Sequence, residues 1–156
     1  MELPVIADFI IHQQCPIVDG IVYSNGEVHL IDFSVDWRQK PISKFVLSEV
    51  TSISELAANG NLGWSDCSFL AKKNYEEAQL TIFCGEGVWG SDGFVGCINS
   101  ATQKLLWIAY FTESNPFCEV KFHEASIFAK STLNLWWCLP LKYPHLLSIS
   151  NLEDFD

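Results

Sequence analysis

The sequence predicts a mainly β protein, or an α+β protein with little helix, built as an antiparallel sandwich or a strongly curved sheet. Three observations carry this prediction. Short apolar segments recur between turn residues, period-two alternation outweighs helical periodicity, and one turn has a strong hairpin signature. The chain has 156 residues, of which 49% are hydrophobic and 18% charged. This length and composition suit a single domain over residues 1–156.

The first element is a hairpin over residues 20–35, where Asn25-Gly26 separates two β-rich segments. Asn-Gly accepts the positive φ angles of a type I′ turn, and the twist of that turn matches the flanking strands. We therefore expect an antiparallel strand on each side of this dipeptide.

A second hairpin is expected from residues 93–98 and 105–111, joined by a polar connection. Residues 105–111 are apolar throughout, which indicates a central strand covered on both faces. Regular alternation places Trp107 and Phe111 on the same face. We expect both side chains in the core.

The remaining elements are shorter. Further strands are expected at residues 5–11, 44–50, 79–84, 118–122, 126–129, 135–139 and 146–149. Residues 54–60 combine helix formers with a final glycine, and a further helical turn is expected at residues 71–78.

Two similar patterns raise the question of an internal duplication, with pseudo-symmetric halves at residues 1–75 and 76–156. Asp19-Gly20 and Asp92-Gly93 each precede a hairpin, and Asn61-Leu62 matches Asn134-Leu135 at the same offset of 73 residues. Convergent hairpin chemistry gives the same pattern, so both explanations stay open at this stage.

The charge balance points to a class of partner. Nineteen acidic residues against nine basic ones give a formal net charge of -10. This charge repels phosphate groups and anionic lipid surfaces, so we expect no direct nucleic-acid binding and no membrane binding. It favours a basic protein partner, although acidity also serves solubility alone.

The N-terminal segment and the cysteines indicate the compartment. Residues 1–11 contain no Lys or Arg before their apolar stretch, unlike a secretory signal. Six cysteines occur without a CxxC spacing, which favours reduced, buried thiols. We expect a cytoplasmic protein.

No motif identifies a reaction, a cofactor or a metal. His123-Glu124 lacks the second histidine of HExxH, and no serine lies in a GxSxG elbow. Residues 85–90 match GxGxxG, but a turn and a strand are expected after them instead of the helix that a dinucleotide site requires. We therefore expect no catalytic, cofactor-binding or metal-binding residues, and no enzyme.

The same glycine-rich loop contains the candidate partner-binding residues Glu86, Trp89 and Asp92. An aromatic side chain beside two acids is typical of an anchor with an acidic rim. The alternative is a loop tryptophan that folds back over the end of the sheet.

Three segments carry a resemblance to a known family: Ser91-Asp92-Gly93-Phe94-Val95, residues 106–111, and Ser114-Asn115-Pro116-Phe117. Over roughly the middle third of the chain, they resemble small acidic bacterial immunity proteins of polymorphic toxins, most closely those of contact-dependent growth inhibition. The resemblance implies a cytosolic inhibitor that neutralises one cognate toxin domain by occlusion, without identifying binding residues.

The charge argument agrees with this implication, because a toxin that acts on nucleic acid needs a basic surface. Two other functions stay open. One is a small ligand-binding or carbohydrate-binding β module, and the other is an enzyme whose active site is assembled from distant residues. The sequence leaves the oligomeric state undetermined.

Overall fold

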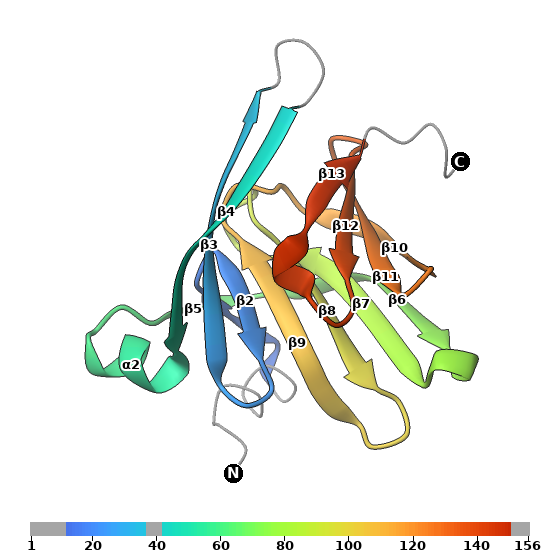
Figure 1. The fold of residues 1–156 in the computed structure, drawn as a ribbon, viewed down its shortest axis with the longest axis horizontal. Helices are drawn as coiled ribbons and strands as arrows, with labels where there is room; N and C mark the ends of the chain where they lie inside the picture. Colours follow the sequence, from blue (N-terminus) through green and yellow to red (C-terminus); the bar gives the residue numbers. More distant parts are fainter. Residues whose placement is uncertain (1–11, 37–41, 151–156) are drawn as a thin grey trace.

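The protein is mainly β and sandwich-like, which confirms the predicted fold class. We describe residues 12–36 and 42–150 of a computed structural model (Figure 1). A seven-stranded antiparallel sheet has the order β4-β3-β2-β9-β8-β7-β6, and a four-stranded sheet has the order β10-β11-β12-β13. A two-stranded ribbon joins β1 to β5.

The strands of the large sheet are β2 (Gly20–Tyr23), β3 (Glu27–Asp36), β4 (Ile42–Ser52), β6 (Ser68–Tyr75), β7 (Leu80–Glu86), β8 (Gly93–Asn99) and β9 (Lys104–Phe111). The small sheet contains β10 (Phe117–His123), β11 (Ser126–Ser131), β12 (Trp136–Pro140) and β13 (Ser148–Ser150). The remaining elements are β1 (Gln14–Ile17), β5 (Gly63–Asp66), the helix α2 (Ile53–Ala58), and the 3-10 turns η1 (Glu76–Ala78) and η2 (Pro144–Leu146).

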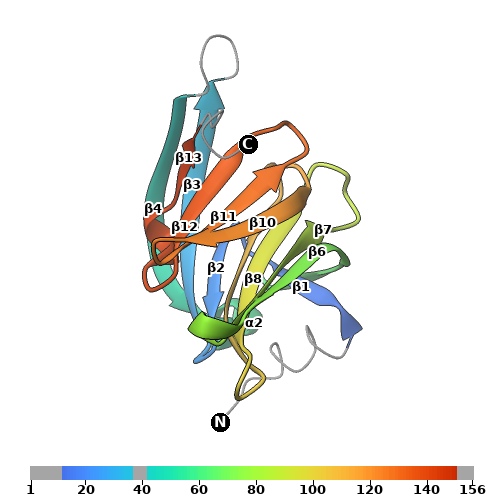
Figure 2. The same cartoon turned by 90° about the vertical axis from the view of Figure 1, so that its right-hand side faces the viewer.

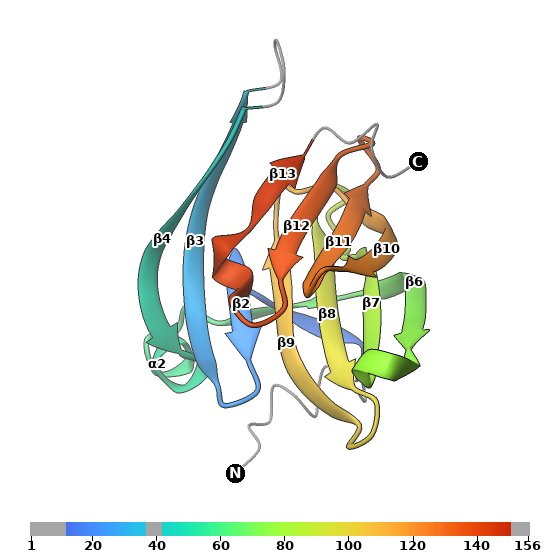
Figure 3. The same cartoon turned by 45° about the vertical axis from the view of Figure 1, so that its right-hand side comes forward.

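The elements form three layers, and the large sheet is the middle one (Figures 2 and 3). The four-stranded sheet covers one face, and the core between the two sheets includes Ile82, Val95, Trp107, Val120 and Trp137. The β1–β5 ribbon and α2 lie on the opposite face. A second apolar cluster fills that side. Its fully buried members include Cys15, Val22, Phe94 and Tyr110.

The first hairpin is confirmed, but the expected type I′ turn is wrong. Gly26 N–H donates to Tyr23 O at 2.9 Å, so Ser24 and Asn25 are the central residues of the turn. Only Gly26, with φ 89°, has a positive φ angle here. A type I turn followed by a glycine in the left-handed region fits these angles, and this form is the usual three-residue hairpin loop.

The second hairpin is confirmed as β8 and β9, and β9 is the central strand that the sequence predicts. The other predicted strands correspond to β4, β7, β10, β11, β12 and β13, with shifted ends. The expected strand at residues 5–11 lies outside the described residues. The sequence prediction missed β1, β5 and β6.

The helix expected at residues 54–60 is confirmed as α2, displaced by one residue at its start. Ser52 Oγ accepts a hydrogen bond from Glu55 N–H at 3.1 Å and caps it. The helical turn expected at residues 71–78 is wrong for most of its length. Residues up to Tyr75 belong to β6, and only Glu76–Ala78 form a 3-10 turn.

Trp136 and Trp137 are both buried, although neighbours on a strand point to opposite faces. Trp137 packs in the core between the sheets. The outer face of Trp136 is covered by lysines, with Lys121 Nζ 5.0 Å and Lys130 Nζ 5.7 Å from the ring centroid. Long lysine stems can cover apolar area in this way while the ammonium stays in water.

The proposed duplication stays a prediction. Its matching dipeptides lie at comparable places, since Asp19-Gly20 leads into β2 and Asp92-Gly93 leads into β8. The same offset of 73 residues relates Trp64 to Trp137, and these two residues lie in different settings. Trp64 is in β5, which pairs with β1, whereas Trp136 and Trp137 are in β12 between β11 and β13. None of the described helices is long and apolar enough to cross a membrane.

Replacing Trp107 by alanine is expected to lower the free energy of unfolding by about 3–5 kcal/mol. The side chain is 2% exposed, and its Nε1–H donates to Leu141 O at 2.9 Å. The change therefore removes apolar packing and a contact between the layers. Urea denaturation measures the effect, with Trp107→Phe as a control that keeps part of the volume and loses less. A loss below about 1 kcal/mol would contradict the core assignment.

The thiols are expected to react in two groups. Burial raises the pKa of Cys84 to about 12 and raises that of Cys97 further, so both stay as unreactive thiols. All six cysteines are unpaired, and Cys118 is exposed. Iodoacetamide should alkylate Cys118 first and the half-buried Cys138 more slowly, which peptide mass spectrometry can follow. The buried thiols of Cys15, Cys67, Cys84 and Cys97 should react only after unfolding. Equal labelling of all six in the native state would contradict the structure.

Candidate functional site

The candidate site is the loop that joins β7 to β8, residues 87–92. Val88 is 68% exposed and Trp89 is 66% exposed, the two largest exposures among the large apolar side chains of the described residues. The loop leads directly into the strand β8, as the sequence predicts, so its GxGxxG pattern has no helix N-terminus to bind a pyrophosphate. Because most of its surface is exposed, Trp89 faces solvent and does not fold back over the sheet.

Asp92 has no exposed surface, which corrects its predicted role as a contact for a partner. Its Oδ2 accepts the hydrogen bond of the Tyr110 hydroxyl, and its Oδ1 accepts one from Trp89 N–H at 3.3 Å. A buried carboxylate needs such donors, because desolvation without them is costly. Asp92 therefore holds the loop from beneath instead of meeting a partner.

Two further contacts fix the loop. Ser65 Oγ, from β5, accepts a hydrogen bond from Val88 N–H at 3.3 Å. Gly87 lies so close to Asp92 that a Cβ atom at this position would be 2.0 Å from the Asp92 Oδ2. Glycine is required here for the close approach of the backbone to the carboxylate. Val88 and Trp89 are consequently presented on a backbone that is anchored at several points.

Tyr110 stays a neutral donor in this network. Burial raises its pKa well above the usual value, and the Asp92 carboxylate raises it further. Burial likewise raises the pKa of the Cys15 thiol, with contributions from Cys67 and Asp92. A thiol under these conditions is a poor nucleophile. The polar groups beneath the loop are therefore suited to holding the loop in place, and they are not suited to covalent catalysis.

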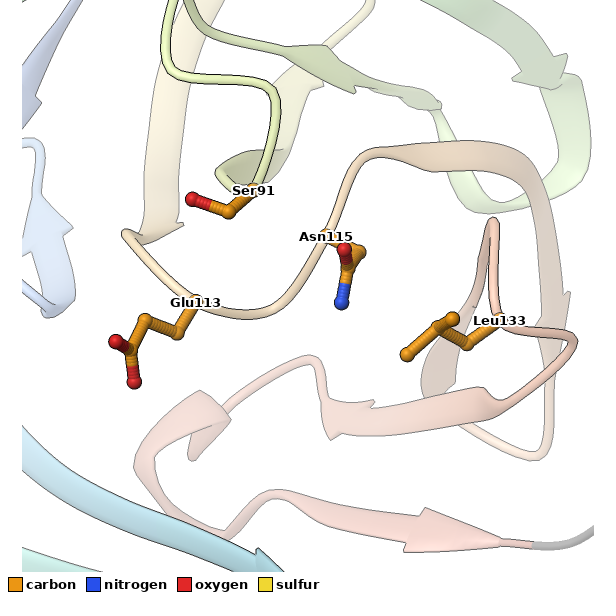
Figure 4. A pocket seen from close by; sticks show the side chains of 4 residues that line it. All are labelled: Ser91, Glu113, Asn115 and Leu133. Atoms are coloured by element: carbon orange, nitrogen blue, oxygen red, sulfur yellow. The ribbon is translucent and has the colours of Figure 1, made fainter. Parts of the chain in front are cut away.

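A depression of about 510 Å³ lies beside the loop and is lined by Ser91, Glu113, Asn115 and Leu133 (Figure 4). The residues come from three segments: the end of the glycine-rich loop, the connection after β9, and the turn between β11 and β12. Glu113 is exposed and supplies a carboxylate, while Leu133 is 48% exposed and supplies an apolar wall.

Hydrogen bonds tie the connection after β9 to the glycine-rich loop. Asn115 N–H donates to Ser91 O at 2.7 Å, and Ser91 Oγ–H donates to Thr112 O at 3.0 Å. The carboxylate of Asp19 accepts a hydrogen bond from Thr112 N–H at 2.7 Å, which ties this connection to β2 as well. The two loops therefore form one continuous, cross-braced surface.

The structure brings only part of the predicted set to this surface. Trp89 is exposed and Glu86 is partly exposed at the end of β7, whereas Asp92 is internal. Glu113 and Leu133 were missed by sequence reasoning, because they are distant in sequence from the loop. Asn115 lies in the Ser114-Asn115-Pro116 turn that the resemblance includes, and this motif was the one signal for it.

No group of three or more His, Cys, Asp or Glu side chains is placed to hold a metal ion within residues 12–36 and 42–150. Comparisons with models of protein families, with curated proteins and with solved structures found no match.

Removing the Tyr110 hydroxyl is expected to loosen the loop. Tyr110→Phe leaves the Asp92 carboxylate buried with one donor fewer, and a lost hydrogen bond to a charged group costs about 1.5–3 kcal/mol. Urea denaturation should report that loss, and amide hydrogen exchange should rise at Val88 and Trp89. Tyr143→Phe is a matched control, because Tyr143 is 58% exposed. Unchanged stability and exchange in Tyr110→Phe would contradict the supporting role of Asp92.

Proposed function

We propose that this chain is a cytoplasmic inhibitor that binds a basic, nuclease-type toxin domain and occludes it, as its resemblance to immunity proteins implies. One observation carries the proposal: the most exposed large apolar side chains of the described residues, Val88 and Trp89, lie on a loop that Asp92 and Ser65 anchor from beneath. Tryptophan is enriched among the residues that dominate binding energy at protein interfaces, so an exposed tryptophan on an anchored loop suits an anchor residue.

The anchoring matters for affinity. Ordering a loop on binding costs free energy, and a loop that is already ordered avoids much of that cost. Trp89 can then act as an anchor residue that enters a pocket of the partner. The depression beside it offers Leu133 for the aliphatic stem of a lysine or arginine, and Glu113 for the cationic head.

The charge of the chain supports the same kind of partner. A formal net charge of -10 attracts a cationic domain over long distances and speeds its association. Glu86 at the end of β7 and Glu113 in the depression beside the glycine-rich loop supply this attraction on the same surface. Asp92, being buried and hydrogen-bonded, contributes little to it.

The test uses the protein encoded by the reading frame next to this chain's gene as the candidate basic partner, with binding followed by biolayer interferometry at several salt concentrations. Glu86→Lys combined with Glu113→Lys should slow association about 10-fold or more and flatten its salt dependence. Trp89→Ala should mainly speed dissociation. Glu76→Lys combined with Glu77→Lys is a matched control, because the same charge change lies on the exposed turn η1.

Circular dichroism first checks that each variant is folded. Full inhibition of the toxin at an equimolar ratio by the unchanged protein, with the expected losses in the variants, supports the proposal. Unchanged binding in the folded Trp89→Ala and Glu86→Lys/Glu113→Lys variants would exclude this loop as the interface. Absence of any complex would remove the inhibitor function itself.

A second candidate function is carbohydrate or small-ligand binding, which the depression beside the glycine-rich loop favours. It combines Ser91, Glu113 and Asn115 as hydrogen-bonding groups with Leu133 as an apolar wall, a mixture typical of small-molecule sites. Calorimetric titration with soluble oligosaccharides separates the two functions. Saturable heat that disappears in Asn115→Ala, without any protein complex, would favour this alternative. Catalytic turnover that persists through purification would favour an enzyme instead.

A further inference from the structure

The strand β4 forms one edge of the seven-stranded sheet and, among the described residues, pairs only with β3. It is 11 residues long. Val46, Leu47 and Val50 on it are 45%, 42% and 52% exposed. A long edge strand with exposed apolar side chains is a template for pairing with another strand.

The direction of the free backbone groups follows from one hydrogen bond. Ile31 N–H donates to Asp19 O at 2.9 Å, so the backbone groups of Ile31 point toward β2. Because successive residues alternate, those of Asp32 point toward β4 and meet its register partner Val46. Phe45 and Leu47 therefore direct their N–H and C=O groups outward, away from β3.

A bulge determines which side chains share a face. Val46 lies opposite Asp32 and Leu47 opposite Ile31, but Glu49 lies opposite Leu30, so Ser48 is an extra residue. Lys44, opposite Ser34, is then on the same face as Val46 and Glu49. Without the bulge, Lys44 and Glu49 would point to opposite faces of the sheet.

We propose that β4 pairs antiparallel with β4 of a second copy of this chain, about a two-fold axis at Val46. In this register Val46 faces Val46 of the second copy, and Phe45 faces Leu47. Lys44 faces Glu49 on each side of the axis. The outward backbone groups of Phe45 and Leu47 form the hydrogen-bonded pairs, and the two Val46 residues form the closer pair between them.

Charge complementarity identifies the second copy as the occupant. Lys44 and Glu49 are both exposed and stand two steps on either side of Val46 once the bulge is counted. An axis at Val46 therefore forms two opposite-charge cross-strand pairs at once. An axis at Lys44 or at Glu49 would instead place two like charges opposite each other, which is unfavourable. Of these three registers, only the one with its axis at Val46 brings opposite charges together.

Sedimentation velocity on the full chain alone, from about 1 μM to about 1 mM, measures the dimer. Lys44→Glu and Glu49→Lys should each weaken dimerisation about 10-fold or more, because either change makes both cross-strand pairs repulsive. The double variant Lys44→Glu/Glu49→Lys should restore it. Lys73→Glu, which makes the same charge change on the opposite edge strand β6, should leave it unchanged.

A cross-link tests the axis. In a Cys118→Ser background, Val46→Cys should form an intermolecular disulfide with oxidised glutathione, because the Cα atoms of such a pair lie about 4.5 Å apart. Asp32→Cys, on the same face of β3, should not. A chain that stays monomeric at every concentration of the sedimentation experiment would overturn the proposal. A dimer that neither single charge variant weakens, or that the double variant does not restore, would overturn it as well. Cross-linking through Asp32→Cys as efficient as through Val46→Cys would overturn the register.

Discussion

Burial of β9 on both faces is the constraint on which the rest of the structure depends. Trp107 and Phe111 point into the core between the sheets, while Ile108 and Tyr110 point toward the layer that contains the β1–β5 ribbon. One strand thus joins all three layers. The same strand supports the candidate site, since the hydroxyl of Tyr110 reaches the Asp92 carboxylate beneath Trp89.

A bulge in this central strand changes the layer in which one of its side chains packs. Cys97 lies opposite Trp107, but Ile98 lies opposite Leu105, so Leu106 is an extra residue. Leu105 accordingly packs with Ile108 and Tyr110, and not with Trp107. The bulge at Ser48 in β4 acts in the same way on Lys44 and Glu49. In both strands an extra residue changes the face on which a side chain lies.

Sequence patterns predicted the elements that tertiary contacts do not override. The uninterrupted apolar segment at residues 105–111 is short and rich in aromatic residues, which favours a buried strand over a helix. β6 was missed because its side chains are mostly exposed, which removes the alternation signal, and because Lys72, Lys73 and Glu76 are good helix formers. Pairing with β7 outweighs that local preference. The ribbon strands β1 and β5 are four residues each, too short for a periodic pattern.

Turn chemistry shows the same limit. Asn25-Gly26 predicts a type I′ turn, but the connection there uses only the glycine at positive φ. The two consecutive positive φ angles of that turn type occur instead at Glu124 and Ala125, φ 49° and 60°, between β10 and β11. Strand pairing on both sides fixes this two-residue connection although neither residue favours it. Local preference ranks turn types, and the register of the strands decides among them.

The candidate site was predictable in part, because sequence neighbours share a loop but not an orientation. Trp89 is exposed and Asp92 is buried three residues later, since Tyr110 on β9 supplies the donor that draws the carboxylate inward. Glu113 and Leu133 join the surface through connections after β9 and β11. No local pattern encodes such a meeting of loops. It follows from the antiparallel order of the strands, which returns their ends to one side of the sheet.

The two edges of the large sheet are protected in different ways, and the difference bears on self-association. β6 carries Lys72 and Lys73, like charges that oppose pairing with a second β6, and Tyr75 on it accepts a hydrogen bond from Phe122 N–H of β10 at 3.2 Å. β4 instead carries one charge of each sign, at positions that match in an antiparallel pair. Pairing through β4 would leave only the two β6 edges at the ends of a continuous sheet. Because the lysines on β6 disfavour pairing between two β6 edges, association through β4 would stop at two copies and would not extend into a fibre.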